Sequence, residues 1–194
     1  TISIDRYGVP HIRAASIDDL WFMQGFNAAR DRLWQIDLWR KRGLGLLARD
    51  FGPGYAEQDR ASRLFLYRGD MDAEWRSYAD DARAICKRFV AGINAYIDLT
   101  EKEPERLPPE FAVLSTKPER WRAEDVVRIR SHGLSRQAVS KVVRATVGAI
   151  AGLDVDDLRR KKTPHVAPTC FDDLPLAEIP LAAVDDIKLA TAKV

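Results

Sequence analysis

Few residues of this chain have types and spacing that could support catalysis by themselves. A terminal threonine such as Thr1 can attack a carbonyl with its own α-amine acting as the base. However, no lysine precedes Lys41, so no early cation is available to tune that amine. We therefore interpret Thr1 as a trimmed end and keep its role as a nucleophile as the third of three functional hypotheses.

The histidines and serines of the chain do not form a recognisable catalytic or metal-binding pattern. His132-Gly133-Leu134-Ser135 looks like part of a catalytic motif, but it lacks the G-x-S-x-G elbow. His11 follows a proline in a predicted strand, where we expect it to make a structural hydrogen bond. No histidine has a metal-ligand spacing such as H-E-x-x-H; the three are His11, His132 and His165.

The two cysteines are Cys86 and Cys170, too few for a zinc cluster or a disulfide-dense scaffold. Cys86 falls on the apolar stripe of a predicted helix, which favours a buried free thiol. A bridge between the two cysteines would fit an oxidising compartment, but their spacing cannot establish it. Whether they are bridged therefore stays open.

The composition favours a globular protein and excludes two classes of partner. Apolar residues make up 46% of the chain and charged residues 31%, which is enough to bury a sizeable core. Basic and acidic residues are mixed and nearly balanced, with a net charge of +2, so no nucleic-acid partner is indicated. No apolar run approaches the roughly 18 residues that span a bilayer. The chain opens on a strand-like segment, and we expect processing to have removed anything earlier.

The hydrophobic pattern predicts a hairpin followed by helices. Residues 1–14 alternate around Gly8, and Pro10 indicates that the second strand is an edge or begins there. Ser16 is expected to cap a helix that ends near Arg42, where Gly43 and Gly45 stop it. Asp37 and Lys41 lie four residues apart on this helix and can form an ion pair. A second helix is predicted from about residue 70 to 103 and a third from about 123 to 152; their apolar residues follow helical spacing.

The prolines and the charge run beyond residue 153 interrupt this pattern. We predict a body, residues 1–153, formed by the hairpin and three long helices. Residues 154–194 are predicted to be an extended segment that packs on a partner chain, because prolines exclude long helices there. The alternative is disorder; the apolar residues of the segment favour packing.

The third predicted helix carries an unusual charge pattern. From Val126 to Leu153 it contains basic residues and no acidic one. A solvated face normally mixes both signs, so this stripe is expected to meet carboxylates of a partner chain, an acidic substrate tail or solvent. The stripe comprises Arg130, Gln137, Lys141 and Arg144.

The order of several motifs resembles the small (alpha) chain of the penicillin acylase family, which consists of N-terminal-nucleophile hydrolases. The resemblance covers roughly residues 4–145 and is poor for residues 146–194. The motifs that carry it are Gly8-Val9-Pro10-His11-Ile12, Gln24-Gly25 with Asp31-Arg32-Leu33-Trp34-Gln35, Phe89-Val90-Ala91-Gly92-Ile93-Asn94-Ala95-Tyr96, Leu107-Pro108-Pro109-Glu110-Phe111, Pro118-Glu119-Arg120-Trp121 with Glu124-Asp125-Val126, and Leu134-Ser135-Arg136.

This resemblance implies an α+β fold: a mainly helical small chain of an αββα heterodimer cut from one precursor. It implies a linear amide hydrolase of the penicillin or acyl-homoserine-lactone acylase type that removes an acyl side chain from a β-lactam or similar N-acyl substrate. The nucleophile would be the serine that begins the large (beta) chain, so this chain would supply no catalytic residue. The resemblance also implies a periplasmic or secreted protein.

The same resemblance implies that the third helix lines the acyl side of the substrate pocket. Relatives commonly place a glutamate on this helix to ligate calcium, but Lys141 stands there in this chain. A protonated lysine has no lone pair for a metal, so we expect no metal ligand and no cofactor here and propose that the ammonium takes the ion's role. The predicted substrate-binding residues are Leu134, Ser135, Arg136, Gln137 and Ala138.

A different class of function competes with the acylase. In this alternative the chain is a non-catalytic helical binding module whose basic stripe docks an acidic partner. The acyl group also stays open: Arg130, Arg136 and Lys141 fit a carboxylate-bearing acyl chain such as glutaryl, but they fit equally well with ion pairs to the large chain.

Overall fold

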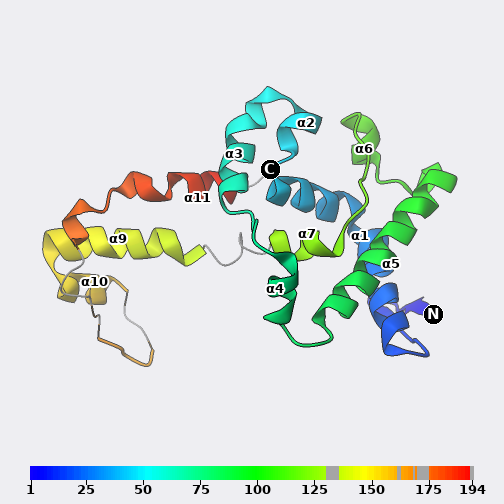
Figure 1. The fold of residues 1–194 in the computed structure, drawn as a ribbon, viewed down its shortest axis with the longest axis horizontal. Helices are drawn as coiled ribbons and strands as arrows, with labels where there is room; N and C mark the ends of the chain where they lie inside the picture. Colours follow the sequence, from blue (N-terminus) through cyan, green and yellow to red (C-terminus); the bar gives the residue numbers. More distant parts are fainter. Residues whose placement is uncertain (130–135, 161–162, 168, 170–174, 193–194) are drawn as a thin grey trace.

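The computed structural model describes all residues except 130–135, 161–162, 168, 170–174 and 193–194. A hairpin and a group of helices form a body, and an arm extends from it (Figure 1). The body comprises β1 (Ile2–Ile4), β2 (Pro10–Ile12), α1 (Ile17–Leu44), α2 (Leu47–Phe51), η1 (Pro53–Tyr55), α3 (Ala56–Leu64), α4 (Met71–Arg76), α5 (Ala82–Lys102), η2 (Pro104–Arg106), α6 (Pro109–Val113) and α7 (Ala123–Arg128). The arm comprises α9 (Arg136–Ala151), α10 (Leu153–Arg159), η3 (Leu176–Glu178) and η4 (Leu181–Val184), and α11 (Asp185–Ala190) leads back to the body.

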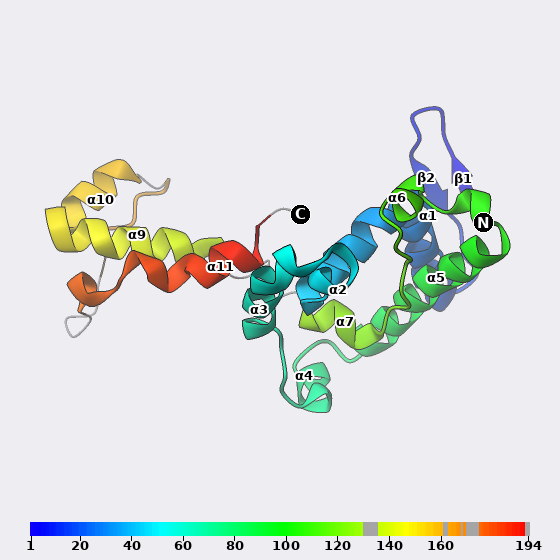
Figure 2. The same cartoon turned by 90° about the horizontal axis from the view of Figure 1, so that it is seen from above.

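The predicted hairpin is present and projects from one end of the body (Figure 2). Its strands pair antiparallel, with Ile4 opposite Pro10. Asp5 organises the turn, because its Oδ1 accepts hydrogen bonds from the backbone N–H groups of Tyr7 and Val9 at 2.9 and 3.0 Å. Asp5 Oδ2 lies 3.0 Å from Nε2 of His11, which confirms a structural hydrogen bond for this histidine.

Helix α1 has the termini that the sequence predicts. Ser16 Oγ accepts a hydrogen bond from the N–H of Asp19 at 3.0 Å, which satisfies one of the free donors at the N-terminus. Gly45 ends the helix with a φ of +67°, in the left-handed region that glycine tolerates. The helix is kinked at Arg32, whose φ of −145° is not helical, so its two halves take different directions.

The core lies where α1 crosses α5, and two glycines allow the close approach. A Cβ at Gly25 would stand 1.9 Å from the carbonyl oxygen of Phe89, and one at Gly92 would stand 1.9 Å from that of Phe22. Each glycine therefore meets the backbone of the opposite helix, and the two helices interlock at this point. The buried residues around the crossing are Ala29, Leu33, Val90, Ile93, Tyr96, Ile97, Phe111 and Trp121.

The second predicted helix was wrong in its continuity, because α4 and α5 are separate. Trp75 of α4 packs with Ala123 and Val127 of α7 in a small second core. Most apolar residues of α5 instead belong to the main core, and only Cys86 near its start packs against the small core. The chain turns between Arg76 and Ala82, so Trp75 reaches the small core from a separate helix.

The third predicted helix is described as two helices, α7 and α9, and residues 130–135 between them lie outside the described part. Beyond residue 153 the expected extended segment instead contains short helices. Helix α11 packs on α3 of the same chain, where Arg60 Nη2 lies 2.7 Å from Oδ1 of Asp186. Ala190 of α11 and Val184 at the end of η4 are buried. Packing of residues 154–194 on a partner chain stays a prediction.

Candidate functional site

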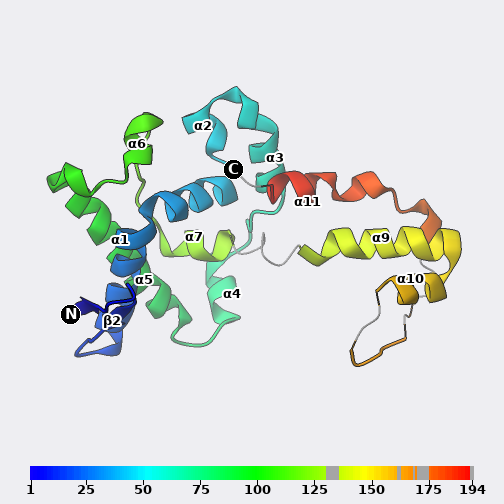
Figure 3. The same ribbon diagram turned by 180° about the vertical axis from the view of Figure 1, so that it is seen from behind.

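The predicted substrate-binding residues lie at the beginning of α9. Leu134 and Ser135 are outside the described residues, and Arg136 is described only as the first residue of the helix. Gln137 is exposed and Ala138 is half-buried. This first turn is the part of α9 nearest to the body (Figure 3). The structure therefore places two of the five predicted side chains, both on the first turn of α9, and their contact with a substrate stays a prediction.

The basic stripe is described only in part, because Arg130 lies outside the described residues, and its two basic members on α9, Lys141 and Arg144, differ in their contacts. Arg144 donates from Nε to Oδ2 of Asp156 at 2.5 Å, and Arg159 donates from Nη2 to Oδ1 of the same carboxylate at 2.7 Å. Asp156 is fully buried, and these two hydrogen bonds hold its pKa below the ordinary value although burial acts to raise it. The negative partner of Arg144 is thus in this chain, whereas Lys141 is exposed.

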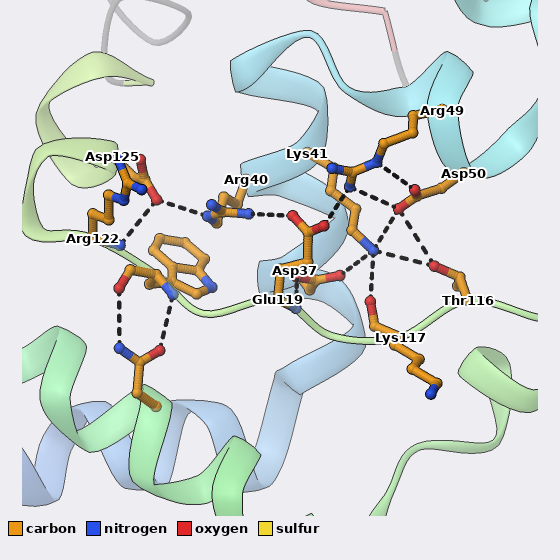
Figure 4. Close-up of polar contacts among 12 residues, drawn as sticks. Asp37, Arg40, Lys41, Arg49, Asp50, Thr116, Lys117, Glu119, Arg122 and Asp125 are labelled. Atoms are coloured by element: carbon orange, nitrogen blue, oxygen red, sulfur yellow. Dashed lines mark hydrogen bonds and ion pairs between the residues drawn. The ribbon is translucent and has the colours of Figure 1, made fainter.

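The most elaborate arrangement of charged groups lies in the body, where α1, α2 and the segment before α7 meet (Figure 4). Four carboxylates and three cations alternate, each within 3.1 Å of the next. We refer to them as the charge network. In order they are Asp37, Lys41, Asp50, Arg49, Glu119, Arg40 and Asp125.

Lys41 is the centre of the charge network. Its side chain is 1% exposed, and Nζ lies 2.8 Å from Oδ2 of both Asp37 and Asp50. It also donates to the carbonyl oxygen of Lys117 at 2.9 Å and to Oγ1 of Thr116 at 3.3 Å. The predicted pairing of Asp37 with Lys41 is confirmed, and four oxygens replace the water that the buried ammonium has lost.

Burial and ion pairing act in opposite directions on the pKa values of three carboxyls of the charge network, Asp37, Asp50 and Glu119. Burial raises the pKa of Asp37 above its ordinary value, in spite of the neighbouring Lys41. Burial is also the largest single influence on Asp50 and Glu119, but it is outweighed by the cations around them together, Arg49 with Lys41 at Asp50 and Arg49 with Arg40 at Glu119. The pKa of each of these two carboxyls therefore lies below its ordinary value. Asp50 and Glu119 are therefore ionised and hold their cations firmly at neutral pH.

These shifts predict how stability depends on pH. Because the pKa of Glu119 is lowered on folding, its contribution is present above the ordinary value of 4.5 and is lost as the pH falls through the folded-state pKa. As the pH is lowered through this range, the free energy of unfolding should fall less for the Glu119→Gln variant than for the unchanged chain. Urea unfolding at a series of pH values measures both. Parallel pH dependences in the two proteins would contradict this assignment.

A second polar contact attaches the segment that carries Glu119 to the core. Asn94 of α5 donates from Nδ2 to the carbonyl oxygen of Trp121 at 3.0 Å, and its Oδ1 accepts from the N–H of Trp121 at 2.9 Å. Asp125 Oδ2 then accepts from the N–H of Arg122 at the start of α7. The charge network is thus positioned by α1 and α5 together.

An open pocket of about 510 Å³ lies on α1 between α2 and α6. Its walls are mainly aromatic and aliphatic, and Asp50 is the acidic residue among them. Both carboxylate oxygens of Asp50 already meet Lys41 and Arg49, so the pocket offers an apolar surface and no available base. The lining residues are Trp34, Leu38, Asp50, Phe51, Tyr55 and Leu114.

The donor set of α9 does not suit a calcium ion. Calcium binds oxygen ligands, chiefly carboxylates and carbonyls, but residues 136–151 contain no aspartate or glutamate. Within the part of the chain that the structure describes, no three His, Cys, Asp or Glu side chains gather as a metal site would require. The sequence resemblance implied a calcium ligand at the position of Lys141, and this side chain is exposed.

Two further sequence predictions concern the thiols and the membrane. Cys86 is a free, half-buried thiol that packs beside Trp75, and burial raises its pKa. Cys170 lies outside the described residues, so a bridge between the two is not tested. Among the helices in the described ranges, none has the length and apolarity needed to cross a bilayer.

Comparison with protein families identifies the chain's relatives. The model of the family described as penicillin amidase matches residues 1–168. The chain belongs to this family. The match extends over the hairpin, the charge network and α9, so the penicillin amidase family accounts for the whole body and for part of the arm.

Sequence identity to individual curated acylases is consistent with this assignment. Penicillin G acylase of Escherichia coli is 30% identical over 126 residues, which cover 64% of this chain and 15% of that protein. The acyl-homoserine lactone acylase QuiP of Pseudomonas aeruginosa is 28% identical over 183 residues, covering 91% of this chain and 20% of that one. The chain thus spans a fifth or less of the length of these curated relatives.

A solved structure supports the fold. The thermostable penicillin G acylase from Alcaligenes faecalis superposes with a TM-score of 0.65 at 26% identity. The superposition covers 90% of this chain and 97% of the matched chain. The mainly helical fold that the sequence resemblance implied is confirmed.

Proposed function

We propose that this chain is the small subunit of a heterodimeric amide hydrolase that removes an acyl group from a β-lactam or a similar N-acyl substrate. The observation that carries the proposal is that this chain matches nearly the whole length of one solved acylase chain but only a small part of a complete acylase. The chain accounts for 97% of one solved acylase chain but for 15% of a whole curated acylase. A separate large chain would supply the remainder of the enzyme.

The proposed division of chemistry places the reacting groups on the large chain. Its terminal serine attacks the amide carbon while the α-amine of that serine accepts the hydroxyl proton and passes it to the leaving amine. Donors on the large chain stabilise the oxyanion, and water then releases the acyl group as an acid. The proposal includes a periplasmic or secreted location, which cell fractionation tests.

The small subunit contributes binding surface in this scheme. Residues 134–138 would form one wall of the acyl pocket, and Ala138, which is half-buried on the first turn of α9, leaves room for a large acyl group. The charge network and the α1–α5 crossing would hold the body from which α9 extends.

Enlarging Ala138 is expected to narrow the acyl specificity. In the two-chain enzyme, Ala138→Phe should lower kcat/KM for a decanoyl amide by roughly 10-fold or more and change that for an acetyl amide little, because a filled pocket excludes the longer chain. Ala149→Phe, an exposed position farther along α9, is the matched control. Equal effects of Ala138→Phe on both substrates would remove this residue from the pocket.

Expression of the complete gene tests the proposed assembly. Intact-mass measurement of the purified product should show this chain together with a longer chain whose first residue is serine. A lone species of 21.9 kDa without amidase activity would contradict the proposal and favour the non-catalytic binding module.

A further inference from the structure

The arm that carries α9 is joined to the body in two ways. The first link is the chain itself, which leads from α7 to α9 through residues 129–135. The second is α11, which contacts α9 and packs against α3 of the body (Figure 1 and Figure 2). Within the described residues, this packing is the most extensive contact between the arm and the body. We refer to residues 184–192 as the strap.

The helix that receives the strap is firmly attached to the rest of the body. Asp59 of α3 is buried, and its two carboxylate oxygens accept hydrogen bonds from the N–H groups of Leu47 and Ala48 at 2.9 and 2.8 Å. Arg63 of α3 donates from Nη2 to the carbonyl oxygen of Gly45 at 2.6 Å. Helix α3 is therefore fixed both to the end of α1 and to the start of α2.

The strap is held on this support by burial and by two hydrogen bonds. Ala190, the last residue of α11, is fully buried. Arg42 of α1 and Gln58 of α3 both donate to the carbonyl oxygen of Ala192, at 3.2 and 3.3 Å. A helix of six residues has little stability of its own, so the strap depends on these contacts with the body.

The helices of the arm are also tied to one another. Arg144 of α9 donates to the fully buried carboxylate of Asp156 in α10. At Gly148 of α9, an added Cβ would stand 3.0 Å from Cδ2 of Leu153 and 3.5 Å from Cδ1 of Leu176, so α10 and η3 lie close against α9. Because these elements pack as a unit, we expect release of the strap to change the direction of α9 as a whole.

We propose that the strap sets the direction of α9 and thereby the position of residues 134–138 in the acyl pocket. Ala190 is then a positioning residue, which acts through α9 and touches no substrate. This inference rests on the proposed function, because that function places residues 134–138 in the pocket. A displacement of about 1 Å far from the reacting atoms can cost roughly 100-fold in rate, so supporting contacts of this kind affect how an enzyme selects its substrate.

Two variants of the processed two-chain enzyme release the strap to different degrees. Ala190→Arg places a large cation in a fully buried position, where an unpaired charge is costly, so the strap should leave α3. Lys188→Arg is the matched control, because the arginine then lies at an exposed position of α11. Asp186→Arg is a milder change that places two cations opposite each other at Arg60 and leaves the buried contacts intact.

The distance between the arm and the body is the first measurement. Spin labels at two exposed positions, Lys102 of α5 and Ala149 of α9, report it by double electron–electron resonance once the native cysteines are replaced by alanine. The unchanged enzyme and Lys188→Arg should give one narrow distribution of distances. Ala190→Arg should give a broad one and Asp186→Arg a smaller change in the same direction, while the thermal unfolding midpoint of the body changes little.

Hydrolysis of two amides is the second measurement. Ala190→Arg should lower kcat/KM for a decanoyl amide by roughly 10-fold and change that for an acetyl amide little, whereas Lys188→Arg should change neither. An unchanged distribution of distances in Ala190→Arg, or an unchanged ratio of the two activities, would overturn the inference and leave the acylase assignment intact. Absence of hydrolysis by the unchanged enzyme would overturn the proposed function, and the distances would still decide whether the strap directs α9.

Discussion

Replacing Lys41 by methionine is expected to lower the free energy of unfolding by about 3–5 kcal/mol, because the change leaves the buried Asp37 carboxylate without its cation and leaves Asp50 with Arg49 alone. Asp37 is fully buried and Asp50 nearly so, and each lies 2.8 Å from the Lys41 ammonium. Methionine matches the length of the side chain, so the lost charge, and not a cavity, dominates the effect. Urea unfolding of the two chains measures the difference.

Lys87→Met is the control for this substitution. Lys87 is exposed on α5, and exposed charges contribute little to stability, so the control should unfold like the unchanged chain. Lowering the pH should partly restore the Lys41→Met variant, because burial has already raised the pKa of Asp37 and protonation removes the unpaired charge. Equal stability of both variants would show that the charge network is not a structural element.

Replacing Gly92 by alanine is the second substitution with a large expected effect. The added Cβ would stand 1.9 Å from the carbonyl oxygen of Phe22 and 2.6 Å from the backbone nitrogen of Phe26. Neither atom can move away as a flexible side chain could, so α1 and α5 must separate at the centre of the core. Such overpacking is expected to lower the free energy of unfolding by about 3 kcal/mol.

Gly54→Ala is the matched control for this second prediction. A Cβ at Gly54 meets no atom within 4 Å, and its backbone is not in the left-handed region. Thermal unfolding followed by circular dichroism should show a large loss for Gly92→Ala and little change for Gly54→Ala. An unchanged midpoint for Gly92→Ala would mean that the helices do not cross as closely as described.

Local patterns in the sequence were sufficient to predict the hairpin and the two ends of α1. Gly8 and Pro10 marked the turn and the start of β2, and Ser16 and Gly45 marked the ends of α1. These features depend on residues within a few positions of each other. The family resemblance depended on the order of whole motifs, which a match over residues 1–168 confirms.

Contacts between distant segments could not be predicted in the same way. The pairing of Arg40 with Asp125 joins residues 85 positions apart, and the sequence revealed only the local pair of Asp37 with Lys41. One signal for this network was present in the sequence: charged residues lie close to the apolar positions of α1. The structure shows that Asp37, Arg40 and Lys41 are buried there. The separation of α4 from α5 likewise depends on Trp75 meeting α7, which helical spacing does not encode.

Reconstitution tests the central claim of this account most directly. This chain and the proposed large chain, purified apart, are assayed for hydrolysis of an N-acyl substrate, first alone and then together. Hydrolysis only by the reassembled pair, abolished when the first serine of the large chain is replaced by alanine, is the predicted result. Hydrolysis by the 194-residue chain alone would contradict it.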